Sequence, residues 1–138
     1  MRTLLLTVLL GISALGCSKT TEEKVVKLSD SVATITVDEL DAKLASKDCQ
    51  AVDANGEGTR KKMGVIPGAV LLTDSDAFST SELPADKSKT LVFYCANTHC
   101  GASHEAAARA LTAGYTNVKV LPEGIAGWVK AGKQTQKI

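Results

Sequence analysis

Two cysteines, Cys95 and Cys100, are the residues of this sequence best suited to covalent chemistry. They flank the short segment Ala-Asn-Thr-His, and Gly101 follows the second of them. A cysteine attacks other molecules in its thiolate form, and a thiolate can also exchange with a second sulfur. Two thiols on one short segment therefore allow either nucleophilic catalysis by one cysteine or redox chemistry by the pair.

Cys95 lies where an expected strand gives way to an expected helix. Residues 91–94 form an apolar run rich in strand formers, and apolar residues recur at helical spacing from Ala106 to Leu111. In an open α/β sheet, ligands bind at the carboxyl ends of the strands, and the N–H groups at a helix N-terminus stabilise a thiolate. The position predicts a lowered pKa for Cys95, although spacing alone equally allows an inert, buried cysteine.

The composition is that of an ordinary globular protein. Hydrophobic residues make up 44% of the 138-residue chain, the formal net charge is +1, and 4% of the residues are aromatic. Such a composition offers neither the basic surface nor the stacking side chains of a nucleic-acid-binding protein, so no nucleic-acid partner is expected. The length fits one domain with a single core.

The first residues have the pattern of an export signal. Arg2 supplies a positive charge, residues 4–12 are mainly apolar, and small residues precede Cys17. The apolar stretch is too short to span a membrane. Its end resembles the lipobox of bacterial lipoproteins, in which the cysteine is acylated and becomes the mature N-terminus, although Ala14 stands where leucine is usual. We expect residues 1–16 to be a signal peptide and a lipid on Cys17 to anchor the protein in the bacterial cell envelope, facing the periplasm; ordinary cleavage with a free Cys17 is the alternative.

Residues 17–31 are polar and charged, so we expect a flexible tether between the lipidated N-terminus and the domain. Beyond Cys17 the remaining cysteines are Cys49, Cys95 and Cys100, an odd number, so at least one thiol stays unpaired even in an oxidising compartment. A fold held together by disulfides is therefore not expected, and Cys49 is expected to pack in the core.

Residues 31–131 are expected to alternate between strands and helices. The expected strands are 31–36, 50–54, 70–72, 91–94 and 117–121, and the expected helices are 37–46, the alanine-rich segment up to 113, and 125–131. Thr36 and Glu39 have the capping-box spacing.

Residues 59–62 form a basic cluster, which is suited either to a solvated face or to steering an anionic substrate. Residues 73–89 are expected to form a loop with at most one helical turn. The alternation predicts an α/β fold with a mostly parallel central sheet and helices on both faces.

Four motifs, taken in order, resemble the rhodanese-homology domain, also called the rhodanese-like domain. They are Ala51-Val52-Asp53, Gly64-Val65-Ile66-Pro67-Gly68-Ala69, Val92-Phe93-Tyr94-Cys95, and Gly114-Tyr115-Thr116-Asn117-Val118 continued by Leu121 to Trp128. The resemblance covers residues 32–132 and implies a single rhodanese-like domain followed by a tail at 133–138. It also implies a sulfurtransferase, in which Cys95 takes sulfane sulfur from thiosulfate or a related donor as a persulfide and passes it to a thiol or another nucleophilic acceptor.

The resemblance further implies that the loop after Cys95 curls round its sulfur. The N–H groups from Ala96 to Gly101 would then face inward and bind both the anionic sulfur and the substrate. The substrate-binding residues expected here are Ala96, Asn97, Thr98, His99 and Gly101. Ser103 is expected to cap the following helix through its hydroxyl, and Trp128 is expected to lie in the core.

The chain departs from the family's pattern at three positions. Cys100 stands where many members have arginine, which makes thiosulfate a poor fit as the donor. Asn55 replaces the arginine usual after Asp53, so Asp53 would lose a partner, and Val65 replaces a histidine. Cys100 offers other chemistry, because it could attack a persulfide on Cys95, release sulfide and leave a disulfide.

His99 and His104 flank the site, but their spacing to the cysteines is not that of a familiar zinc site, so no metal or other cofactor is expected. Three functions remain open. The first is a sulfurtransferase with Cys95 and Cys100 as catalytic residues, a small sulfur donor and a thiol acceptor. The second is a thiol–disulfide redox protein that uses the same pair, and the third is a binding module that keeps the fold without catalysis.

Overall fold

The computed structural model describes residues 17–138. The predicted signal peptide, residues 1–16, lies outside the described residues, as does the side chain of Cys17. In chain order the elements are α1 (Cys17–Ser29), β1 (Ala33–Thr34), α2 (Val37–Ala45), β2 (Cys49–Asp53), α3 (Glu57–Met63), β3 (Val70–Leu71), the 3-10 turn η1 (Thr80–Glu82), β4 (Thr90–Tyr94), α4 (Ala102–Thr112), β5 (Val118–Leu121) and α5 (Gly124–Lys130). Within this part of the chain, no helix combines the length and the apolar character that a membrane crossing requires.

The five strands form one parallel sheet in the order β1-β5-β4-β2-β3. The central strand β4 pairs with β2 and β5, so that Tyr94 lies between Asp53 and Leu121 at the carboxyl ends of the strands. From Leu91 to Tyr94 this strand is fully buried, as expected for a parallel sheet covered on both faces. The predicted α/β fold is confirmed, and all pairings between these strands are parallel.

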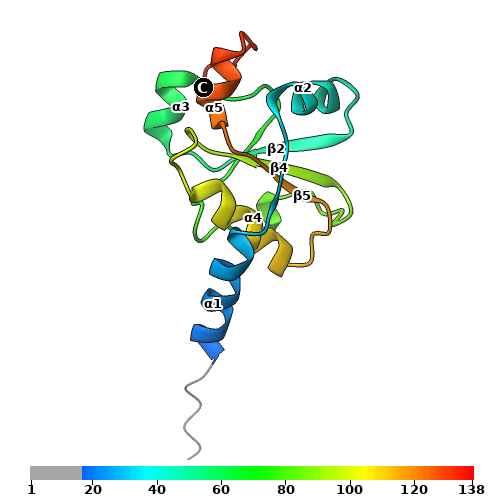
Figure 1. Ribbon diagram of the computed structural model, residues 1–138, viewed down its shortest axis with the longest axis vertical. Coiled ribbons are helices and arrows are strands. Elements are labelled where there is room, and N and C mark those ends of the chain that lie inside the picture. Colours follow the sequence, from blue (N-terminus) through cyan, green and yellow to red (C-terminus); the bar gives the residue numbers. More distant parts are fainter. Residues whose placement is uncertain (1–16) are drawn as a thin grey trace, which may run out of the picture.

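Helices cover both faces of the sheet (Figure 1). On one face, Leu91 and Phe93 of β4 pack with the alanine-rich side of α4. On the other face, Val92 packs in a cluster with residues of α2 and α5, including Trp128, which is a core residue as predicted. Alternate residues of β4 thus pack against the helices on opposite faces of the sheet, because successive side chains of a strand point to opposite faces.

The segment predicted to be a flexible tether forms a helix, α1, from Cys17 to Ser29. It packs against α4, with Val25 only 3% exposed, and Glu22 forms an ion pair of 3.3 Å with Arg109. Its first turns extend away from the sheet (Figure 1). Polar composition predicts flexibility, whereas the buried Val25 and the ion pair of Glu22 with Arg109 hold this helix on α4.

The sequence also failed to predict α3, which occupies the basic cluster. This helix starts at Gly56 without a side-chain cap and buries none of its residues completely. It therefore lacks the apolar periodicity by which an amphipathic helix is recognised. One of its basic residues, Arg60, faces the interior and is described below.

Several local predictions are confirmed. The capping box of α2 is present, since Glu39 N donates to Thr36 Oγ1 at 3.3 Å and Thr36 N donates to Glu39 Oε2 at 2.9 Å. Cys49 is buried as a free thiol. The loop between β3 and β4 holds one short 3-10 turn, η1.

Candidate active site

The Cys95 side chain lies where the sequence predicted it, between the central strand and α4. Cys95 directly follows β4 and is 1% exposed. Its Sγ lies 3.2 Å from the backbone oxygen of Cys100 and 3.2 Å from Ser103 Oγ. The sulfur is therefore enclosed by its own loop, residues 96–101, and by the first turn of α4.

The pKa of the Cys95 thiol is raised, which is the reverse of the sequence prediction. Burial is the largest cause, because it disfavours the charged thiolate. A side-chain hydrogen bond with Cys100 adds to this effect, and so does the negative charge of an ionised Cys100. The hydroxyl and the backbone amide of Ser103 act in the opposite direction. This conformation of the loop thus favours the neutral thiol.

The loop does not form the predicted cradle of inward-facing amides. Within the described chain, no N–H group of residues 96–101 is hydrogen-bonded to the Cys95 sulfur. The amide of His99 donates to Asn97 Oδ1 at 3.0 Å, and the amide of Cys100 donates to Asn97 O at 3.1 Å. These bonds make a tight turn within the loop, which directs the Cys100 carbonyl, rather than an amide, at the sulfur.

Ser103 does not cap α4 as predicted. The cap position is Gly101, which has no side chain to make the bond, whereas Ser103 is 1% exposed and its hydroxyl contacts the Cys95 sulfur. Because the helix starts two residues earlier than a cap at Ser103 would place it, this side chain lies inside the first turn and contacts the thiol. Ser103 is therefore a site residue that sequence reasoning assigned to another role.

Helix α5 holds the backbone at the start of the loop. Ile125 N donates to Cys95 O at 2.9 Å, and Ala126 N donates to Ala96 O at 3.0 Å. Gly124 permits this approach, because a Cβ at its position would lie 2.5 Å from Cys95 O, and its φ is +60°. Since the N–H of a trans peptide points opposite to its C=O, the amides that follow these two carbonyls face away from α5. Gly124 belongs to the Leu121 to Trp128 motif, but no role was predicted for it from the sequence.

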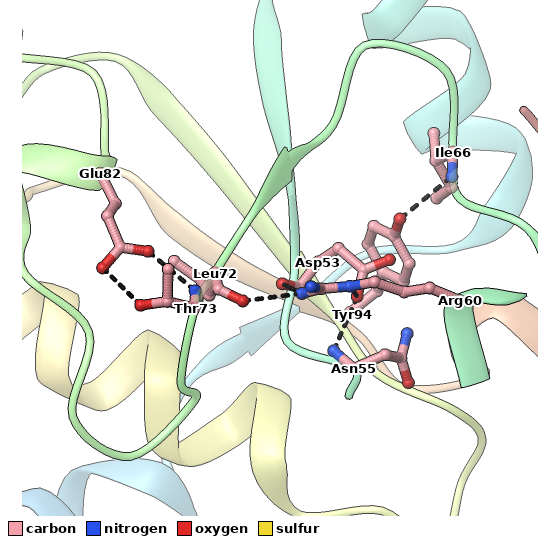
Figure 2. Close-up of polar contacts among 8 residues, drawn as sticks. All are labelled: Asp53, Asn55, Arg60, Ile66, Leu72, Thr73, Glu82 and Tyr94. Carbon is pink, nitrogen blue, oxygen red and sulfur yellow. Dashed lines mark hydrogen bonds and ion pairs between the residues drawn. The ribbon is translucent and has the colours of Figure 1, made fainter. Parts of the chain in front are cut away.

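Beside the loop, a buried ion pair connects the carboxyl end of β2 to α3 (Figure 2). Asp53 is fully buried, and its Oδ1 accepts hydrogen bonds from Asn55 N at 2.7 Å and from Arg60 Nε at 3.3 Å. Arg60 Nη2 also donates to Asp53 O at 3.0 Å and to Leu72 O at 2.9 Å. The expectation that Asp53 lacks a cationic partner is therefore wrong, because Arg60 of α3 supplies the guanidinium that Asn55 cannot.

Tyr94, the last residue of β4, belongs to the same region (Figure 2). Its hydroxyl accepts a hydrogen bond from Ile66 N at 3.0 Å, which ties the Gly64–Ala69 segment to the central strand. Burial raises the pKa of Tyr94, and the nearby Asp53 carboxylate raises it further. Tyr94 is thus a neutral structural residue that supports the strand ends next to Cys95.

An open pocket of about 480 Å³ lies beside the loop. The residues that line it are Ser29, Asp30, Thr98, His99, Cys100, Gly101, His104 and Glu105. Cys100 is half-buried and is the thiol that lines this pocket, whereas the Cys95 sulfur lies behind the loop. Of the predicted substrate-binding residues, Thr98, His99 and Gly101 line the pocket, and Ala96 and Asn97 do not. Nothing in the sequence pointed to the two residues at the end of α1, because α1 itself was not predicted.

The histidines and cysteines around the pocket do not form a metal-binding group. In residues 17–138, no set of three or more His, Cys, Asp or Glu side chains is arranged to hold a metal ion.

Residues 36–131 match the rhodanese-like domain family, and the chain therefore belongs to this family. The match begins at the cap of α2 and ends just after α5, so that it contains the whole sheet apart from β1. No curated protein sequence matches the chain.

Solved structures share the fold at low sequence identity. A rhodanese-like domain protein from Staphylococcus aureus has a TM-score of 0.57 and 28% identity, over 76% of this chain and 99% of its own. A human single-domain sulfurtransferase has a TM-score of 0.58 and 20% identity, over 72% of this chain and 96% of its own. A thiosulfate sulfurtransferase from Pseudomonas aeruginosa has a TM-score of 0.65 and 21% identity, over 85% of this chain and 22% of its own length.

Proposed function

We propose that this protein is a sulfurtransferase that carries sulfane sulfur as a persulfide on Cys95. The observation that carries the proposal is the position of the Cys95 sulfur, at the carboxyl end of the central strand and 3.2 Å from Ser103 Oγ in the first turn of α4. Membership of the rhodanese-like family supports it, as does the fold shared with two proteins named as sulfurtransferases.

The proposed reaction has two steps at one sulfur atom. First, the Cys95 thiolate attacks the outer sulfur of the donor, a new S–S bond forms, and the rest of the donor leaves with the electron pair of the broken S–S bond. Second, an acceptor thiolate attacks the outer sulfur of the persulfide, and Cys95 leaves as a thiolate. Each step exchanges one S–S bond for another, so neither an oxidant nor a reductant is needed.

The proposed chemistry requires the loop to rearrange when Cys95 ionises. A thiolate has no proton to donate to the Cys100 oxygen, and the two negative groups, 3.2 Å apart, repel each other. The hydroxyl of Ser103 can donate to the anion without moving. The backbone amide of Ser103 also favours the anion, and the amides of Ala96 and Asn97, whose peptide planes are oriented by α5, are further candidate donors once the Cys100 carbonyl turns away.

A second candidate function is thiol–disulfide redox chemistry by Cys95 and Cys100. The observation that favours it is the contact between the Cys95 sulfur and the Cys100 backbone, which brings both free cysteines to one turn of the chain. The same contact would let Cys100 attack a Cys95 persulfide, with release of sulfide and formation of a disulfide. The non-catalytic binding module is the third candidate and is favoured by the enclosure of Cys95.

Intact-mass measurement separates the three candidates. The reduced protein is incubated with inorganic polysulfide, freed of donor and weighed, alongside Cys95→Ser and Cys100→Ser. Sulfur transfer predicts a gain of one sulfur atom that thiols remove, that Cys95→Ser loses and that Cys100→Ser keeps. A loss of two hydrogens that requires both cysteines would instead favour the redox protein, and an unchanged mass would leave the binding module.

We also propose that the protein is a lipoprotein of the bacterial cell envelope, anchored through Cys17 and facing the periplasm. The sequence before Cys17 supports this proposal, since it has the order of a positive start, an apolar stretch and small residues. The test is to express the full chain in a bacterium and compare it with Cys17→Ala. The parent chain should fractionate with membranes and gain the mass of a lipid, and the variant should do neither.

A further inference from the structure

The pocket beside the loop has two acidic residues among those that line it. The carboxylates of Asp30 and Glu105 line it together with the imidazoles of His99 and His104, and no lysine or arginine of the described chain is among its lining residues. An anionic sulfur donor would meet two like charges there, which is unfavourable. A ligand with a positively charged group would meet two opposite charges.

The walls of this pocket are built by two helices that pack against each other. Asp30 directly follows α1, while His104 and Glu105 belong to the first turn of α4. The buried Val25 and the ion pair between Glu22 and Arg109 hold α1 on α4. The volume of about 480 Å³ is in the range of sites for small organic molecules.

Cys100 connects the pocket to the reactive sulfur. Its side chain lines the pocket, and its backbone oxygen is 3.2 Å from Cys95 Sγ. A molecule in the pocket therefore lies next to the Cys100 peptide, whose carbonyl contacts the Cys95 sulfur. When that peptide turns away, as the ionised or persulfidated Cys95 requires, the pocket opens onto the sulfur.

We propose that this pocket binds the sulfur acceptor and that the acceptor is a thiol with an ammonium group. This inference rests on the proposed sulfurtransferase function and names its acceptor class. The ammonium group is held between Asp30 and Glu105, and the thiol end is directed past Cys100 toward Cys95. The acceptor thiolate bonds to the outer sulfur of the persulfide, the bond from that sulfur to Cys95 breaks, and Cys95 keeps the electron pair. In sum, R–SH and Cys95–S–SH give R–S–SH and Cys95–SH.

Single-turnover transfer with matched thiols tests the inference. The protein is loaded with inorganic polysulfide, freed of donor, and mixed with 2-aminoethanethiol or 2-mercaptoethanol. The first thiol carries an ammonium group where the second carries a hydroxyl group. The two thiols differ in intrinsic reactivity. The measured quantity is therefore the second-order rate constant with 2-aminoethanethiol divided by that with 2-mercaptoethanol, and this ratio is compared between each variant and the parent. Asp30→Asn and Glu105→Gln are each expected to lower this ratio roughly two- to fivefold, the effect of one exposed ion pair, and the double variant should lower it further. Glu23→Gln is the control, because Glu23 lies on α1 but does not line the pocket.

The results separate the two proposals. Reduced ratios in the pocket variants, together with an unchanged ratio in Glu23→Gln, support the ammonium-bearing acceptor. An unchanged ratio in the double variant, while both thiols still remove the sulfur, overturns this inference and leaves the sulfurtransferase function standing. A parent protein that cannot be loaded at Cys95, shown by intact mass, overturns the proposed function and this inference with it.

Discussion

Replacing Gly124 of α5 with alanine should destabilise the protein and distort the loop after Cys95, although Gly124 is not part of that loop. The added Cβ would lie 2.5 Å from Cys95 O, 2.7 Å from Ala96 C and 2.8 Å from Ala96 O. These are backbone atoms, so the contacts cannot be relieved by rotating a side chain. Either α5 or the start of the loop has to move.

The expected loss of stability combines two physical effects. An alanine at φ +60° is in the left-handed region, which costs about 1–2 kcal/mol for a residue with a Cβ. Moving α5 away from the loop also weakens the bonds from Ile125 N to Cys95 O and from Ala126 N to Ala96 O, each worth about 0.5–1.5 kcal/mol. Together we expect a decrease of about 2–5 kcal/mol in the free energy of unfolding, a large part of the stability of an ordinary domain.

Urea unfolding followed by Trp128 fluorescence measures this loss, and intact mass after polysulfide treatment measures persulfide loading. The matched control is Gly58→Ala, because Gly58 lies in α3 with open space around its Cβ position, and alanine there should stabilise by at most about 1 kcal/mol. Equal midpoints for Gly124→Ala and the parent would refute the role of α5 as the anchor of the loop. A destabilised variant that still loads sulfur at the parent rate would refute its link to the chemistry.

Three further predictions follow from the contacts of single residues. Ser103→Ala removes the hydroxyl that lowers the pKa of Cys95 but keeps the backbone amide, so the pKa should rise further. Alkylation by iodoacetamide at fixed pH should then slow, since less thiolate is present. In the parent, the alkylation rate should climb with pH through neutrality without levelling off, and a plateau near pH 7 would contradict the raised pKa. Arg60→Met leaves the Asp53 carboxylate buried without its cation, which should cost about 3–5 kcal/mol in urea unfolding, with Arg60→Lys losing less; an unchanged midpoint in the Met variant would show that the ion pair is dispensable. Val25→Ser should lower the free energy of docking of α1 by up to about 1.5–3 kcal/mol, because the apolar side chain is no longer buried. Hydrogen exchange should become faster in α1 but not in β4. Amides of α1 that already exchange freely in the parent would mean that the helix is not docked.

The central strand and the location of the thiol could be predicted because local chemistry determines both. A continuous apolar run from Leu91 to Tyr94 is stable only where both faces are covered, and Thr36 with Glu39 marks a helix start by its own side-chain bonds. In such places the residue types alone select the structure, with little help from distant parts of the chain.

The helices α1 and α3 could not be predicted because distant partners hold them. The pairing of Glu22 with Arg109, and of Arg60 with Asp53, joins residues that no local pattern connects. The orientation of the peptides around Cys95 has the same origin. Whether a carbonyl or an amide faces the sulfur depends on turns within the loop and on α5, and not on which residues the loop contains.

The dependence of the loop on α5 has a consequence for biosynthesis. The two amides that bind the backbone of Cys95 and Ala96 belong to α5, which is synthesised after the loop, so in a growing polypeptide the start of the loop lacks these two bonds until α5 has been made and docked. A chain truncated before α5 would contain Cys100 and Ser103, which contact the Cys95 sulfur, but not the two bonds that hold the start of the loop in place.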